Sequence, residues 1–137
     1  MIRRKTTYEI QAELFSALAH PARLEILELL RDGEACVCHI QAMLEQRQAY
    51  ISQHLNVLRQ AGLVTNRKEG LRVYYQITDP CVLALVDSMK TVLQSMGLWP
   101  GVADPMMLAP TSSRECNCPQ CQPSPAETRT GIKSLQV

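Results

Sequence analysis

Cys36 and Cys38, in the run Cys36-Val37-Cys38, are the residues whose type and spacing predict chemistry most directly. Thiolates are soft ligands that select soft metal and metalloid ions, whereas hard cations prefer oxygen. Residues two apart on an α-helix point to nearly opposite sides, so both sulfur atoms could not reach one ion while the segment stays regular. We therefore expect ion capture to unwind or tilt the start of a helix. The alternative is two small apolar side chains packed in a core.

Four other cysteines could add to such a site: Cys81, Cys116, Cys118 and Cys121. The last three have the spacing C-x-C-x-x-C and could form a three-sulfur site of their own or supply a third ligand. No apolar run for a signal peptide follows the basic N-terminus, and no stretch approaches the ~20 apolar residues that span a bilayer. We expect a cytoplasmic protein without a membrane partner, in which cysteines serve metal or redox chemistry rather than structural disulfides.

A second stretch, residues 47–62, has the pattern of an amphipathic helix. Ile51, Leu55 and Leu58 form its apolar stripe. The other side is polar or cationic, as base edges and phosphates require, and carries Arg47, Gln48, Ser52, Gln53, Asn56 and Arg59. Such a helix is roughly 20 Å long and fits a major groove about 12 Å wide. The alternative is a solvated polar face on an ordinary helix.

Charge is distributed unevenly along the chain, although the formal net charge is only +1. Residues 6–45 contain two basic side chains against seven acidic ones. Residues 46–75 contain one acid, Glu69, against five basic side chains: Arg47, Arg59, Arg67, Lys68 and Arg72. That local excess predicts a nucleic-acid-binding surface.

The elements that must position these residues follow from periodicity and from proline and glycine. Helices are predicted over residues 6–19, 21–31, 37–45, 47–62 and 80–96, and a β-hairpin over 63–77 with its turn at residues 68–70. Apolar residues of the last helix cover more than one face, which predicts that a partner chain covers part of it. The fold class is mainly α with a small β-hairpin, a dimeric winged helix-turn-helix.

Composition changes after residue 98, where prolines become frequent and periodicity ends. We therefore predict two regions: residues 1–98 as a winged helix-turn-helix DNA-binding and dimerisation domain, and residues 99–137 as a flexible, Pro-rich, Cys-containing C-terminal tail.

The segments CVCHI and ISQHLNVLRQAGLVTNRKEGLRVYYQI, within residues 9–97, resemble the ArsR/SmtB family of metal-sensing transcriptional repressors. The resemblance implies a homodimer, joined through the first and fifth helices, that binds palindromic operator DNA and leaves it when a metal or metalloid binds. It implies As(III) as inducer, with Sb(III), Cd(II) or Pb(II) as alternatives, and no organic cofactor. Arsenic-responsive relatives often have a third cysteine where this chain has Gln41.

Specific roles follow for the DNA-contacting residues. We assign base contacts chiefly to Gln48, Ser52 and Gln53, and phosphate contacts to Arg47 and Arg59. The hairpin cations Arg67, Lys68 and Arg72 should contact the DNA backbone or the adjacent minor groove. His54 lies beside the apolar stripe on helical geometry, so we expect it to be packed and hydrogen-bonded. In a dimer, half-sites should lie ~34 Å apart.

Three other functions are weighed against this one. A repressor of the same fold could respond to oxidation or persulfide at Cys36 and a partner cysteine. A thiol oxidoreductase would depend on Cys118 and Cys121, but such motifs act at a helix N-terminus beside a strand, whereas these lie among prolines. The tail could also be a metal buffer unconnected to DNA. We expect the protein not to be an enzyme.

Overall fold

The computed structural model describes residues 3–100, so most of the predicted tail, including Cys116, Cys118 and Cys121, lies outside the described residues. The described residues form five helices and three short strands, in the order α1 (Thr7–Leu18), α2 (Pro21–Leu29), β1 (Ala35–Cys36), α3 (Val37–Leu44), α4 (Gln48–Gln60), β2 (Val64–Glu69), β3 (Arg72–Ile77) and α5 (Cys81–Ser95). The predicted class, mainly α with a small β-hairpin, is confirmed.

Local signals set the helix ends close to the predicted positions. Thr6 and Glu9 form a capping box at α1, in which the Glu9 amide donates to Thr6 Oγ1 at 3.2 Å and the Thr6 amide donates to Glu9 Oε2 at 2.7 Å. His20 caps α2 through Nδ1, which accepts from the Ala22 amide at 3.1 Å, and proline follows at the first helical position. Gly62, at φ +78°, follows α4 in the left-handed conformation that favours glycine.

The sheet is antiparallel with strand order β1-β3-β2. In the hairpin, called the wing below, β2 continues through Glu69, which pairs with Arg72. The predicted turn at residues 68–70 is therefore wrong by about one residue, because Gly70 at φ +60° opens a two-residue turn with Leu71. Strand β1 was not predicted, since two residues are too few for an alternating pattern; it pairs Cys36 with Tyr74.

The core lies between α2, α3, α4 and the sheet. The predicted stripe of α4, Ile51, Leu55 and Leu58, is fully buried. In α2 the fully buried residues are Ile26 and Leu27, whereas Leu24 is half-buried. Helix α4, whose polar side is predicted to contact DNA and which is called the recognition helix below, is thus fixed to the core along its apolar side.

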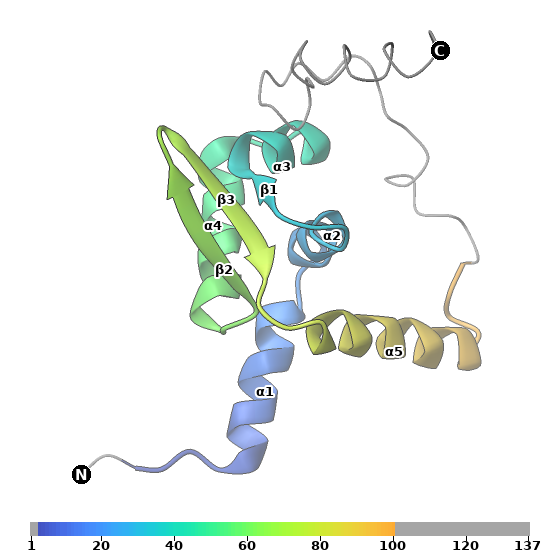
Figure 1. Cartoon of the computed structure of the whole chain (residues 1–137). Coiled ribbons are helices and arrows are strands. Elements are labelled where there is room, and N and C mark those ends of the chain that lie inside the picture. Colours follow the sequence, from blue (N-terminus) through green and yellow to red (C-terminus); the bar gives the residue numbers. More distant parts are fainter. Residues whose placement is uncertain (1–2, 101–137) are drawn as a thin grey trace, which may run out of the picture.

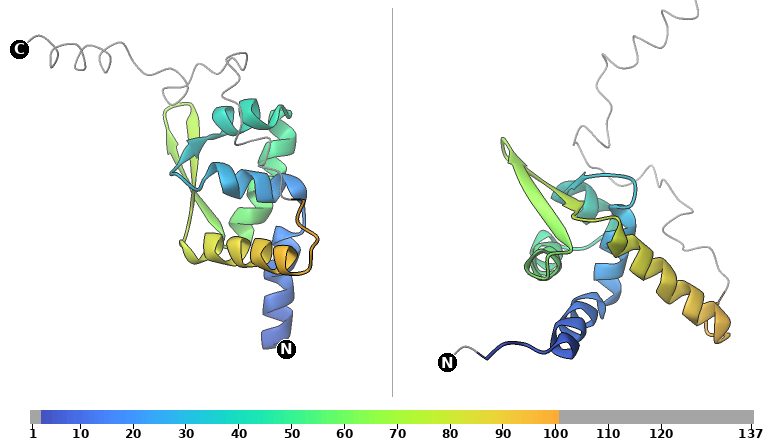
Figure 2. Two further views of the ribbon diagram at one scale, coloured as in Figure 1. Left: turned by 90° about the vertical axis from the view of Figure 1, so that its right-hand side faces the viewer. Right: turned by 60° about the horizontal axis from the view of Figure 1, so that its bottom comes forward.

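The wing lies beside α4, and α3 lies toward the wing tip (Figure 1). Helices α1 and α5 project from the opposite end of the molecule, as both views of Figure 2 also show. There they form, with α2, an apolar groove of about 210 Å³ that is lined by Phe15, Leu18, Ala19, Leu24, Leu85, Val86 and Met89. Within residues 3–100, no helix is both long and apolar enough to cross a bilayer.

Candidate nucleic-acid interface and sulfur site

The recognition helix exposes the side chains that the sequence assigned to bases. Gln48, Ser52 and Gln53 are exposed, on the side of α4 away from the core. Asn56 is half-buried and accepts a hydrogen bond from Arg59 Nη2 at 2.9 Å. No side-chain hydrogen bond caps α4 at Arg47, and helix N-termini bind phosphates in other proteins.

The wing cations differ from one another in their surroundings. Lys68 and Arg72 are exposed near the tip. Arg67 instead donates from Nε to Glu34 Oε2 at 2.8 Å and from Nη1 to Glu69 Oε2 at 2.7 Å. Its guanidinium also lies 4.6 Å from the Tyr74 ring centroid. The sequence analysis paired Arg67 with neither carboxylate; the pairing with Glu69 was predictable, because alternate residues of a strand share a face. Arg67 must exchange these partners to bind a phosphate.

His54 is buried on the inner side of α4, as predicted, with 7% of its surface exposed. Its Nδ1 accepts a hydrogen bond from Arg23 Nε at 3.2 Å, and its ring lies 4.2 Å from His20 and 4.5 Å from Tyr50 between centroids. Arg23 also donates from Nη1 to the Ala17 carbonyl at 3.0 Å. Arg23, which the sequence analysis did not single out, thereby joins the end of α1 to α4.

This histidine cluster gives a pH dependence of stability. Burial lowers the pKa of His54 below its ordinary 6.5, and the charges of His20 and Arg23 lower it further. The unfolded chain therefore binds a proton that the folded chain rejects, so the free energy of unfolding should fall as pH drops below about 6.5. Urea unfolding at pH 7.5 and 5.5 should show this loss, and His54→Gln should reduce the difference between the two pH values.

A variant at His39 serves as the comparison for His54→Gln, because burial lowers the pKa of His39 as well. His39→Gln should also reduce the pH dependence, but it leaves the contact between Arg23 and His54 intact. An unchanged pH dependence in His54→Gln would contradict the assignment to His54.

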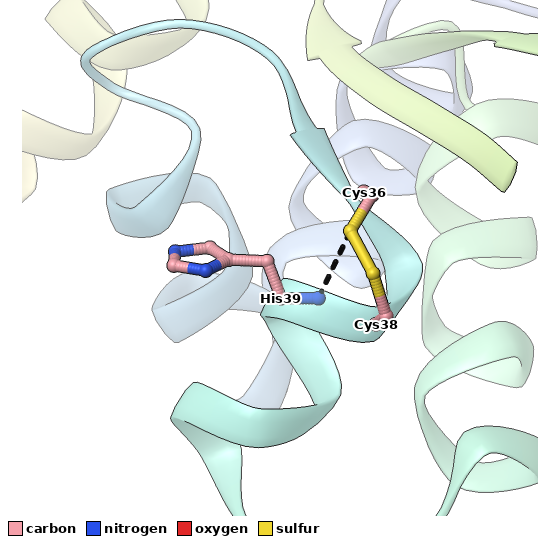
Figure 3. The surroundings of a disulfide bond; sticks show 3 residues. All are labelled: Cys36, Cys38 and His39. Carbon is pink, nitrogen blue, oxygen red and sulfur yellow. Dashed lines mark hydrogen bonds between the residues drawn. A yellow bond between two sulfur atoms is a disulfide. The ribbon is translucent and has the colours of Figure 1, made fainter. Parts of the chain in front are cut away.

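The sulfur pair, Cys36 and Cys38, is joined in a disulfide with a Cα–Cα distance of 5.3 Å (Figure 3). Cys36 is the N-cap of α3, with extended backbone at φ −76° and ψ 154°, and its Sγ accepts the His39 amide at 3.2 Å. Cys36 and Tyr74 form a small second core against which Cys38 and Ala42 pack. The His39 imidazole points away from the sulfur atoms (Figure 3).

Two expectations about the sulfur pair differ from the structure. The cysteines are bonded rather than separate thiolates, and α3 is regular from Val37 while the sulfur atoms touch. The distortion of the helix that we expect on ion capture stays a prediction. The expectation assumed that both cysteines are helical. Cys36 instead belongs to β1, and its extended backbone turns Sγ toward Cys38. The sulfur atoms can therefore meet without unwinding the helix.

A cavity of about 240 Å³ connects the sulfur pair with the predicted DNA-contacting residues. Its lining consists of Cys36, Val37, Cys38, Gln41, Gln48, Ser52, Leu71, Arg72, Val73 and Tyr75. Among residues 3–100, no three histidine, cysteine or acidic side chains gather as a metal site would require. Cys81 is thus not brought to the sulfur pair; it is exposed at the start of α5, where hydrogen bonding to Asp79 raises the pKa of its thiol.

Comparison with known proteins finds transcriptional regulators with similar sequences and folds. Residues 20–66 match the model of bacterial regulatory proteins of the arsR family. A helix-turn-helix transcriptional regulator from Methanocaldococcus jannaschii is 46% identical over 60% of this chain and 97% of that protein. The arsenical resistance operon repressor of Escherichia coli is 41% identical over 53% of this chain and 62% of that protein. A homodimeric winged helix-turn-helix DNA-binding domain from Mycobacterium bovis superposes with a TM-score of 0.61 at 28% identity, covering 75% and 100% of the two chains.

Proposed function

Because this chain belongs to the ArsR family of DNA-binding transcriptional regulators, we propose that it is a repressor whose operator affinity is set by the chemical state of its sulfur pair. The observation that carries this proposal is the shared cavity. Cys36 and Cys38 line it together with Gln48 and Ser52 of the recognition helix and Arg72 of the wing. A ligand or bond at the sulfur pair therefore acts beside the residues assigned to DNA.

We assign the DNA contacts as the exposure of the side chains suggests. Gln48, Ser52 and Gln53 contact bases, with Asn56 beside them, and Arg47 and Arg59 contact phosphate from α4. Lys68 and Arg72 contact the backbone or minor groove from the wing, and Arg67 does so after leaving Glu34. The repressor acts in the cytoplasm as a homodimer through α1 and α5 on a palindromic operator, whose two half-sites match the two recognition helices.

Substituting a base-contacting residue and substituting a phosphate-contacting residue should affect DNA binding in different ways. Gln53→Ala should weaken operator binding by ~1–3 kcal/mol and relax the preference for operator over random DNA. Lys68→Ala should weaken binding to all sequences about equally and reduce the slope of log affinity against log salt by about one. Fluorescence anisotropy over a salt series measures both effects. Full operator preference in Gln53→Ala would refute the base contact.

As(III) is the inducer that we propose first, with Sb(III), Cd(II) or Pb(II) as alternatives. Once it is reduced to two thiolates, the sulfur pair fits such an ion in donor type and placement, since the two sulfur atoms lie side by side. Cys36 and Cys38 would hold the ion, which would supply a bridge between β1 and α3. A third ligand would come from Cys116, Cys118 or Cys121, which lie outside the described residues, since Cys81 is not brought to the sulfur pair.

A second candidate is a dithiol–disulfide switch of the same repressor. The observation that favours it is the Cys36–Cys38 bond, which requires no third ligand. In both candidates the bridged pair fixes the start of α3 to β1, which pairs with Tyr74 of the wing. We assign the bridged form to the repressor that has left the operator. In this form the recognition helix and the wing, which must both fit the DNA, can no longer move freely relative to each other. A thiol oxidoreductase would depend on Cys118 and Cys121 and has no support among residues 3–100.

Operator binding by the full chain tests the proposal and separates the two candidates. The reduced protein should bind a selected operator duplex, and the proportion bound should be measured after As(III), Sb(III), Cd(II), Pb(II) or Zn(II) and after mild oxidation. Thiolate charge-transfer absorption marks ion binding, whereas a lower free-thiol count marks oxidation. Unchanged affinity under every condition would refute control by the sulfur pair.

A further inference from the structure

The cavity beside the sulfur pair has the size and lining of a site for a small anionic molecule. Its volume of about 240 Å³ lies below the roughly 300–1,000 Å³ typical of sites for drug-sized ligands. Gln41, Gln48 and Ser52 offer polar groups, and Arg72 is the charged residue of the lining, which contains no carboxylate. A small molecule with a carboxylate suits this lining better than a cationic one.

The two cysteines differ in access and in electrostatics. Cys38 is half-buried, whereas Cys36 is 1% exposed, so a reagent in the cavity reaches Cys38 first. Cys36 Sγ accepts the His39 amide at the N-terminus of α3 (Figure 3). A helix N-terminus and an amide donor both stabilise a thiolate. Cys38 is therefore the sulfur that a reagent meets first, and Cys36 is the buried sulfur beside it that accepts a backbone amide.

We propose that this cavity binds a small organic disulfide bearing carboxylates, which oxidises the sulfur pair by way of Cys38. This inference deepens the proposed function and rests on its dithiol–disulfide form. The lining also determines how bound DNA affects this reaction. Gln48, Ser52 and Arg72 belong both to the cavity and to the surface assigned to DNA, so bound operator closes the entrance and the oxidant reacts with the free repressor.

The reaction takes two exchange steps. The Cys38 thiol loses its proton to solvent, and its Sγ attacks one sulfur of the disulfide RSSR, forming Cys38–SR and expelling one RS⁻. The Cys36 thiol also loses its proton to solvent, and its thiolate then attacks Cys38 Sγ, forms the Cys36–Cys38 bond present in the structure, and expels the second RS⁻. The sulfur pair loses two electrons and two protons, and RSSR gains the two electrons. Arg72 pairs with a carboxylate of the oxidant during both steps.

Cys36→Ser stops the reaction after the first step and makes it measurable. Serine is a good N-cap, so α3 should persist, which circular dichroism can check. The full-length variant is treated separately with 3,3′-dithiodipropionate, 2-hydroxyethyl disulfide and cystamine, which are anionic, neutral and cationic. Peptide mass spectrometry gives the rate of adduct formation at Cys38. Dithiodipropionate should react about threefold faster than cystamine, and the added substitution Arg72→Gln should remove that preference.

Cys38→Ser is the matched control, because it leaves only the buried sulfur of the pair. Adduct formation at Cys36 in this variant should be about tenfold slower than at Cys38 in Cys36→Ser, since access limits thiol exchange. Equal rates for the three disulfides, or faster modification of Cys36 than of Cys38, would overturn the proposed site.

The same measurement with DNA bound tests whether the operator closes the entrance of the cavity. Saturating amounts of a duplex selected by the reduced parent protein should slow adduct formation at Cys38 about tenfold or more, while alkylation of the exposed Cys81 proceeds at its usual rate. Equal Cys38 rates with and without the duplex would refute the closure, even if oxidation still lowers operator affinity. If oxidation leaves operator affinity unchanged, the dithiol–disulfide form of the proposed function fails while the cavity chemistry stands. The two failures are therefore distinguishable.

Discussion

The double variant Cys36→Ser/Cys38→Ser is expected to bind operator DNA normally and to lose its response to inducer. Reduced parent protein should lose affinity by roughly 5–150-fold when the sulfur pair is bridged, the usual range of coupling between two sites. The double variant cannot form the bridge. Its folding should be retained, because serine can cap α3 at position 36 in place of the Cys36 sulfur that accepts the His39 amide. Anisotropy titrations with and without As(III) or oxidant measure the response.

The matched control replaces the tail cysteines instead. The triple variant Cys116→Ser/Cys118→Ser/Cys121→Ser should keep the response to oxidation, since the bond forms between Cys36 and Cys38. For As(III), the triple variant and Cys81→Ser show which residue supplies a third ligand. Loss of every response in the tail variant alone, with the double variant still responding, would overturn our choice of site. Removal of residues after Pro110 with no change in response would support a separate metal-buffering tail.

Phe15→Glu is expected to convert the repressor to a monomer and to reduce operator affinity on the order of 100-fold. Phe15 lines the apolar groove with Leu85 and Met89 but is 58% exposed in the single chain, so folding should survive. In a dimer the carboxylate introduced at position 15 would be buried without a partner, which opposes packing of a second copy of the chain over this groove. Losing the second recognition helix removes the avidity of two linked sites, which is worth about 10²–10⁴ in affinity.

Sedimentation and anisotropy at equal protein concentration measure these two effects. Gln76→Glu adds the same charge at an exposed position on β3, outside the groove, and should leave both measurements near the parent values. A dimeric Phe15→Glu protein with full operator affinity would exclude this groove as the dimer surface. Retained unfolding cooperativity in urea shows that the variant is folded.

The bounds of the helices were largely predictable because their signals are local. A cap at Thr6, the proline at position 21 and glycine at position 62 act within a few residues of the helix ends that they set. The stripe of Ile51, Leu55 and Leu58 likewise predicts which side of α4 is buried, since the period of a helix is fixed. The same period places Gln48, Ser52 and Gln53 on the opposite, polar side, where all three are exposed.

Contacts between distant segments were not predictable in the same way. Arg67 lies against Glu34, 33 positions earlier, and Arg23 lies against His54, 31 positions later. No periodic pattern encodes such pairs, because they depend on how the elements pack. The sequence could count Arg67 among the basic residues but could not show that carboxylates already hold it.

The sequence by itself determined the winged helix-turn-helix class, the position of the recognition helix and the presence of two closely spaced sulfur atoms. Only the tertiary structure decided what those sulfur atoms can do. Pairing of β1 with β3 holds Cys36 extended, so that its Sγ meets Cys38 while α3 stays regular. Two residues carry too short a pattern to predict a strand, and their conformation is set by hydrogen bonds to Tyr74 and Tyr75, almost 40 residues away.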